Sequence, residues 1–153
     1  MKRFILMLAI VATLFACKKE DKIAKNLWKG DGIWNIEVWD SKTTSTYFEE
    51  DNTSEYLINM GTLQFNKDGS GKLTINNEGG IETFKYTNTS DKLAITFDYW
   101  DEGEQKVFDM DWKKNKLDLK LYTVDKYTTG DGNGGTVNVT YTHRLNMTCS
   151  KKK

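Results

Sequence analysis

The chain has 153 residues, 22 Lys and Arg against 22 Asp and Glu, one His, two Cys and no Pro. This length fits one domain, and balanced charge gives no reason to expect nucleic acid as a partner, because phosphate binding needs a clustered basic excess. A single His excludes a metal site with two His ligands from this chain and argues against a hydrolytic triad. We therefore expect no enzyme, no cofactor and no bound metal.

The first 16 residues are organised as a secretory signal. Lys2 and Arg3 precede an apolar run from Phe4 to Leu14, which is too short to span a bilayer as a helix. The run ends in Leu14-Phe15-Ala16-Cys17. We expect residues 1–16 to be a signal peptide and residues 17–27 to form a polar tether. An ordinary signal peptide that happens to carry a Cys is the alternative.

Leu14-Phe15-Ala16-Cys17 resembles the lipobox of bacterial lipoproteins. The resemblance implies that Cys17 is lipidated and becomes the first residue of an outer membrane lipoprotein, held by two or three acyl chains. The following Lys18-Lys19-Glu20-Asp21 resembles the surface-export signal of Bacteroidetes lipoproteins. A plain hydrophilic tether explains these four residues equally well, so the periplasm and the cell surface both remain open.

The remainder of the chain has the composition of β-structure. After Cys17 it contains 17 Thr but only two Ala, with many aromatic and β-branched residues. Apolar and polar residues alternate with period 2 in segments 34–38, 63–65, 73–75, 84–86, 93–99, 108–112, 117–121 and 137–149, and a weaker segment covers 56–60. The alternation predicts that the following side chains lie on the buried face of their strands: Trp34, Phe65, Leu73, Phe84, Leu93, Ile95, Phe97, Phe108, Met110, Leu119, Val139 and Tyr141.

Turn-like residues separate these segments. The breaks 66–71, 76–80, 88–91, 101–104 and 113–115 are short, whereas 40–55 and 124–135 predict longer connections. Short connections favour antiparallel neighbours, and strands with one apolar face must close on themselves or pack in two sheets. We therefore predict an all-β fold: an antiparallel up-and-down meander of about eight strands, closed as a barrel over residues 28–149. Residues 150–153 would be a basic tail.

Gly32-Ile33-Trp34, at the start of the first strand and after a lipobox and tether, resembles the opening of lipocalin-like lipoproteins of Bacteroidetes. The resemblance implies a lipocalin-like barrel whose floor is closed by this Trp and by a basic residue of the last strand. Arg144 is the candidate for that residue, although its position in the alternation puts it on the polar face. Trp28 is the alternative to Trp34 in this pair.

The predicted inner face is rich in large rings. The expected pocket residues are Trp34, Phe65, Phe84, Tyr86, Phe97, Tyr99, Phe108, Trp112, Tyr141 and His143. These side chains could line a pocket for a small apolar or amphipathic molecule, which would make the protein a binding module. They could equally fill the barrel of an envelope interaction protein or inhibitor. A void open at one end would favour the first function, and a filled interior with an exposed apolar patch would favour the second.

Two oxygen-rich segments are candidate metal sites. Residues 66–74 resemble the first nine positions of an EF-hand calcium loop, but the twelfth position is Asn77 where a bidentate Glu is needed. The acidic residues between Asp98 and Glu104 fit a solvated hairpin tip. We therefore expect both segments to be turns. The predicted partners are a membrane, through Cys17, and a small hydrophobic ligand.

Overall fold

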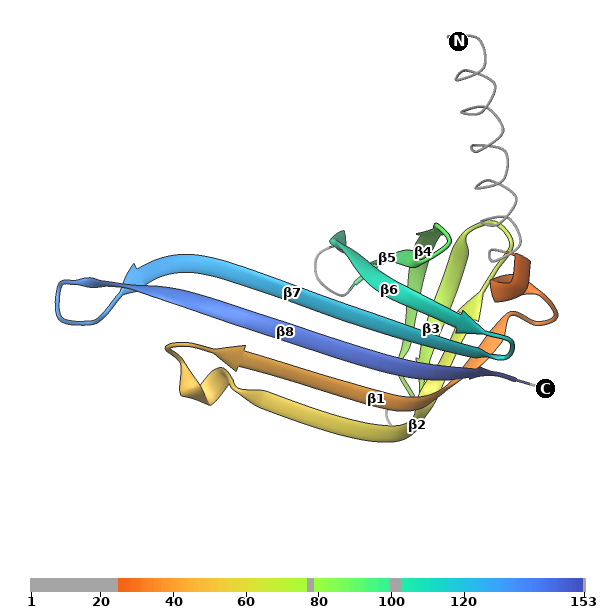
Figure 1. The fold of residues 1–153 in the computed structure, drawn as a ribbon, viewed down its shortest axis with the longest axis horizontal. Helices are drawn as coiled ribbons and strands as arrows, with labels where there is room; N and C mark the ends of the chain where they lie inside the picture. The colour runs from red at the N-terminus through yellow and green to blue at the C-terminus, as the bar shows by residue number, and fades with distance from the viewer. Residues whose placement is uncertain (1–24, 77–78, 100–102, 153) are drawn as a thin grey trace, which may run out of the picture.

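The computed structural model describes residues 25–76, 79–99 and 103–152. It confirms the predicted fold class: eight antiparallel strands follow one another in sequence order and close into one barrel (Figure 1). The strands are β1 (Ile33–Ser45), β2 (Thr53–Phe65), β3 (Ser70–Ile75), β4 (Ile81–Asn88), β5 (Lys92–Phe97), β6 (Gln105–Lys113), β7 (Lys116–Gly130) and β8 (Thr136–Lys151). The expected signal peptide, Cys17 and most of the tether lie outside the described residues.

Strand length divides the barrel into two parts. β3, β4, β5 and β6 have six to nine residues, whereas β1, β2, β7 and β8 have 13 to 16. Pairing of β6 with β7 stops at Asp109 and Lys120, but β7 pairs with β8 as far as Gly130 and Thr136. The long strands therefore project beyond the short ones as a four-stranded sheet in the order β2-β1-β8-β7 (Figure 1). We call residues 40–45, 53–58, 122–130 and 136–144 of this sheet the arm.

The arm corrects the sequence prediction for residues 40–55 and 124–135. Most of both segments is strand; between the strands lie only residues 46–52, which include the short 3-10 helix η1 (Glu49–Asp51), and the tip 131–135. Sequence periodicity missed these strands because most arm residues are at least partly exposed. Without one buried face, a strand need not alternate apolar and polar residues.

A β-bulge in β1 reverses the facing of its second half. The register with both neighbouring strands shifts between Ile36 and Val38. Because a one-residue slip exchanges the two faces of a strand, Trp39 rather than Val38 continues the inward row of Trp34 and Ile36. Trp39 packs against the hydrophobic core. The predicted alternation of Trp34, Ile36 and Val38 therefore fails at its last residue.

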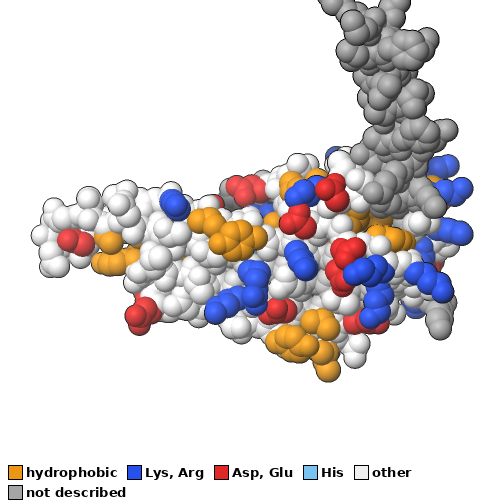
Figure 2. Space-filling model, viewed as in Figure 1, with side chains coloured by type: hydrophobic (Ala, Val, Ile, Leu, Met, Phe, Trp, Pro, Cys, Tyr) orange, Lys and Arg blue, Asp and Glu red, His pale blue; other side chains and the backbone are white. Residues whose placement is uncertain are grey.

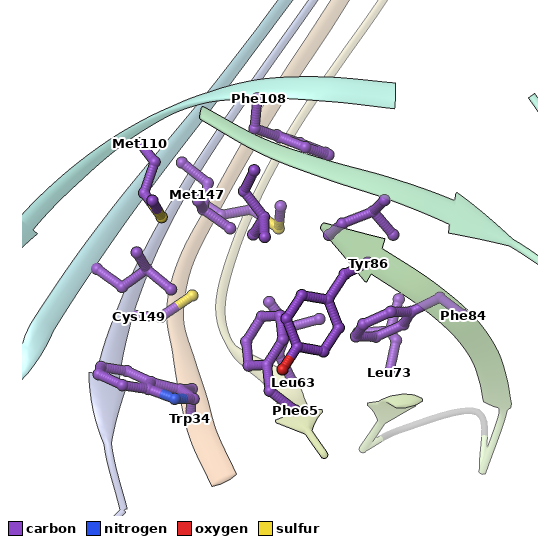
Figure 3. Close-up of a cluster of buried hydrophobic side chains, with 14 of the residues drawn as sticks. Trp34, Leu63, Phe65, Leu73, Phe84, Tyr86, Phe108, Met110, Met147 and Cys149 are labelled. Carbon is purple, nitrogen blue, oxygen red and sulfur yellow. The ribbon is translucent and has the colours of Figure 1, made fainter. Parts of the chain in front are cut away.

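The inner face agrees with period 2 elsewhere. Of the 12 side chains predicted to be buried, 11 are buried and Tyr141 is half-buried. Ten of the buried ones converge on one core, part of which is drawn in Figure 3. Val139 is buried on the arm, outside this core. Tyr141 lies on the arm, where β8 has left the short strands behind.

One end of the barrel is closed by the chain segment before β1. Residues 25–28 are helical, and Leu27 is completely buried. The Trp34 indole Nε1–H donates to the carbonyl oxygen of Leu27 at 2.9 Å. Gly32 makes the connection: its φ is +69°, and a Cβ there would lie 2.1 Å from the Phe65 carbonyl oxygen. The folded unit thus starts before residue 28, inside the segment expected to be tether.

The predicted pair of Trp34 and Arg144 is wrong. Arg144 lies on the outer face of the arm, where its Nη2 is 3.2 Å from the Asp40 carboxylate. Lys151 is the register partner of Trp34, and its Nζ lies 5.0 Å from the indole centroid. Arg144 and Lys151 are separated by an odd number of positions along β8, so their side chains point to opposite faces of the sheet. β8 therefore continues through Lys151, past the predicted barrel end at residue 149.

Candidate ligand-binding cavity

A partly open cavity of about 330 Å³ lies where the arm leaves the barrel. Its lining residues come from seven strands, all except β4, and are Trp39, Leu63, Leu73, Ile95, Phe97, Lys106, Phe108, Leu121, Thr123, Asp125, His143, Leu145 and Met147. On β8 these residues are displaced toward the arm from Lys151, which marks the closed end. The cavity therefore lies away from the end that Leu27 covers.

The base of the cavity is apolar. Leu63, Leu73, Ile95, Phe108 and Met147 are all buried and come from β2, β3, β5, β6 and β8. These residues are inward positions of strands that alternate cleanly, which is why one apolar surface forms here. A ligand placed on this surface would lose contact with water at its apolar part.

Aromatic rings fill the barrel beside this base. Phe65, Phe84 and Tyr86 meet edge to face, with ring centroids 5.0 to 6.4 Å apart (Figure 3). The Tyr86 hydroxyl donates to the carbonyl oxygen of Asn66 at 2.7 Å, and burial raises the pKa of Tyr86 to about 12. This phenol is therefore a satisfied structural donor.

The rim of the cavity is polar. Lys106, Thr123, Asp125 and His143 line it from β6, β7 and β8. The His143 Nδ1 is 2.9 Å from the Thr43 hydroxyl oxygen, which fixes the imidazole against β1. The Lys106 ammonium forms an ion pair with Glu104 at 3.3 Å. The cavity thus combines an apolar base with hydrogen-bonding groups at its edge, a common arrangement in small-molecule sites.

Three of the ten expected pocket residues line this cavity, namely Phe97, Phe108 and His143. Trp34, Phe65, Phe84 and Tyr86 are buried in the core, outside the lining. Trp112 is half-buried and packs edge to face on Trp34, with ring centroids 5.0 Å apart. Tyr141 lies on the arm, where its hydroxyl binds the Asp51 carboxylate and its ring stacks on Tyr127.

Tyr99 is a correction, because 82% of it is exposed. The alternation 93, 95, 97 and 99 predicted an inward ring, but β5 ends at Phe97. Beyond it, the Asp98 amide donates to the Thr83 carbonyl and the Tyr99 amide donates to the Glu82 carboxylate. The chain has left the barrel wall at this point, so strand periodicity no longer sets the direction of the side chain.

Several lining residues were outside the expected set. Leu121, Leu145 and Met147 belong to the alternating segments, and counting aromatic rings alone left them out. Trp39 enters through the bulge, which no sequence signal marks; its buried Nε1 has no hydrogen-bond partner among the described residues. Asp125 fell within a predicted loop.

The remaining reactive groups do not form a second site. The Cys149 thiol is buried, and burial raises its pKa to about 12. Among the described residues, no three His, Cys, Asp or Glu side chains gather closely enough to hold a metal ion. No helix within the described ranges has the length and hydropathy needed to cross a membrane.

Comparison with known proteins gives no family. No family of known proteins matches the chain, and no curated protein matches it.

Proposed function

We propose that the protein is a membrane-anchored, lipocalin-like lipoprotein that binds a small apolar or amphipathic molecule in its barrel. The cavity carries the proposal: about 330 Å³ with an apolar base, a polar rim and a closed opposite end. Pockets for small ligands span about 300–1,000 Å³, so the occupant belongs at the small end of that range. A single alkyl chain or a two-ring molecule suits this site better than a porphyrin.

The lipobox-like segment supports the anchor. Cys17 precedes Lys25, the first described residue, by eight positions. Eight residues span at most about 29 Å, so a lipid on Cys17 would keep the barrel close to the membrane. The chain enters the barrel beside Leu27, at the closed end. In this arrangement the cavity and the arm would point away from the lipid surface.

A neutral fluorescent probe tests the binding function. N-phenyl-1-naphthylamine should bind the purified protein saturably at micromolar concentration, because its naphthalene and phenyl rings are apolar and suit the apolar base. Leu121→Trp should weaken this binding at least about tenfold, since Leu121 lines the cavity and a larger ring would occupy it. Tyr122→Trp is the matched control: the next residue on β7 is 67% exposed and absent from the lining. Equal effects of the two variants, with both folded, would contradict the proposal.

A second candidate function is capture of an extended peptide by the arm. β6 pairs with β7 only up to Lys120, so the arm part of β7 has no strand on that side within the described chain. Open edges of this kind accept an added strand.

In Figure 2 the visible surface carries hydrophobic side chains only in separate small groups among charged ones, so no large apolar patch appears in this view. Absence of saturable probe binding would favour this second function.

A further inference from the structure

We infer that the cavity selects an amphipathic amine: a molecule with a short apolar chain and a protonated amino group that Asp125 accepts. This inference rests on the proposed ligand-binding function and specifies the ligand. Its basis is the charge pattern of the cavity rim together with the rings that line it. A ligand class follows when the polar groups of a site are complementary to one charge and not to the other.

Asp125 is the acceptor. It lies on the cavity side of β7, two residues beyond Thr123, and lines the cavity with it. Its register partner is Tyr141, whose hydroxyl is already bound to the Asp51 carboxylate. The Asp125 carboxylate has neither a hydrogen bond nor an ion pair within the part of the chain that the structure describes.

The other rim groups leave this negative charge uncompensated. Lys106 is the cation that lines the cavity, and its ammonium is paired with Glu104 at 3.3 Å. That ion pair is neutral as a unit, so Asp125 sets the sign of the rim. An anionic head group would meet the Asp125 carboxylate at the rim, whereas an ammonium group would form a charge-assisted hydrogen bond with it.

The rest of the lining suits the apolar chain of such a ligand. Trp39, Phe97 and Phe108 supply three aromatic rings to the cavity, and Phe108 belongs to its apolar base. His143 adds a polar contact, because its Nδ1 is engaged by Thr43 and Nε2 is the ring nitrogen left for a ligand. An ammonium head beside Asp125 and an alkyl chain on the leucine base would satisfy both parts of the site.

Three ligands of equal chain length separate the head groups. Octylamine, octanol and octanoate are titrated against bound N-phenyl-1-naphthylamine at pH 7.5 and low ionic strength, where the amine is protonated and the acid ionised. We expect octylamine to displace the probe at a concentration at least about tenfold below that of octanoate, with octanol between them. Octanoate displacing the probe as well as octylamine would overturn the amine inference and leave the binding function standing.

Asp125→Asn is the decisive variant, because it keeps the shape of the side chain and removes its charge. We expect the apparent affinity for octylamine to fall about five- to tenfold, and the affinity for octanol to stay within twofold. Asp118→Asn removes the same charge from the outward face of β7, away from the lining, and should leave the order of the three ligands unchanged. Equal behaviour of the two variants would overturn the role of Asp125. If neither the probe nor any amphiphile binds, the proposed function fails together with this inference.

Discussion

Lys151 places its ammonium 5.0 Å from the centroid of the Trp34 indole and also donates to the carbonyl oxygen of Asn26 at 2.6 Å. These two contacts tie the last strand to the first strand and to the segment before it. The Trp34 Nε1–H completes the connection through Leu27. The closed end of the barrel is thus held by β1 and the segment just before it, together with Lys151 of the last strand, which lies 125 residues after Asn26.

Replacing Lys151 tests this closure. Lys151→Ala should lower the free energy of unfolding by about 1–3 kcal/mol, because it removes a cation–π contact and a charge-assisted hydrogen bond. The measurement is the urea midpoint at constant slope. Lys152→Ala is the matched control, since Lys152 is exposed and contributes its backbone amide to the Ile33 carbonyl. A midpoint for Lys151→Ala no lower than that of the control would show that the contact with Trp34 contributes nothing.

Truncation of a core ring tests the packing of the filled part of the barrel. Phe84 is 1% exposed and meets Phe65, Tyr86 and Phe97 edge to face. Phe84→Ala should therefore lower the free energy of unfolding by roughly 3–5 kcal/mol. Tyr99→Ala should change it by less than about 0.5 kcal/mol, since Tyr99 is largely exposed. Similar losses in the two variants would contradict the assignment of inward and outward faces.

Sequence alone predicted the strands that have the hydrophobic core on one face and solvent on the other. β3, β4 and β5 lie between core and solvent along most of their length, so their side chains alternate and period 2 identifies them. The arm segments 40–45 and 124–130 could not be found in this way, because all of their residues are at least partly exposed. Period 2 also fails where the backbone changes register, as it does between Ile36 and Val38, and where a strand ends, as it does at Phe97.

The candidate site was predicted less well than the fold, for the same reasons. Phe97, Phe108 and His143 lie on regular strands, and alternation placed them correctly on the inner face. The inward position of Trp39 depends on the bulge in β1. The position of Asp125 depends on the arm part of β7, where the sequence shows no alternation that would predict a strand. Which inward rings line a void and which fill the core depends on the packing of all strands together, and that packing is absent from any local pattern.

The proposed membrane anchor has a direct test. Cys17→Ala should move the protein from the detergent phase to the aqueous phase when cells are fractionated with a phase-separating detergent, because removal of the acyl chains abolishes stable anchoring. Lys19→Ala, close to the same site but without the thiol, should stay in the detergent phase. Full retention of Cys17→Ala in the detergent phase would exclude lipidation as the means of attachment.

The stability of the protein should fall as pH rises above about 9, and Cys149 is the group expected to start this decline. Burial raises the pKa of its thiol from 9.0 to about 12 in the folded protein. A group whose pKa is raised by folding binds more protons in the folded state than in the unfolded state between those two values. Its contribution to stability is therefore complete below pH 9 and is lost progressively toward pH 12.

Two variants separate this titration from that of Tyr86, whose pKa is raised from 10.0 to about 12. Between pH 8 and 9.5 the decline in the free energy of unfolding should come mainly from Cys149. Cys149→Ala should therefore flatten the plot of this free energy against pH in that range. The same variant should also lower the free energy of unfolding at every pH, because packing is lost. Tyr86→Phe should keep that early decline and reduce the one above pH 10. Urea denaturation at half-unit pH steps measures both curves. An unchanged slope below pH 9.5 in Cys149→Ala would show that the thiol is not protected by the core.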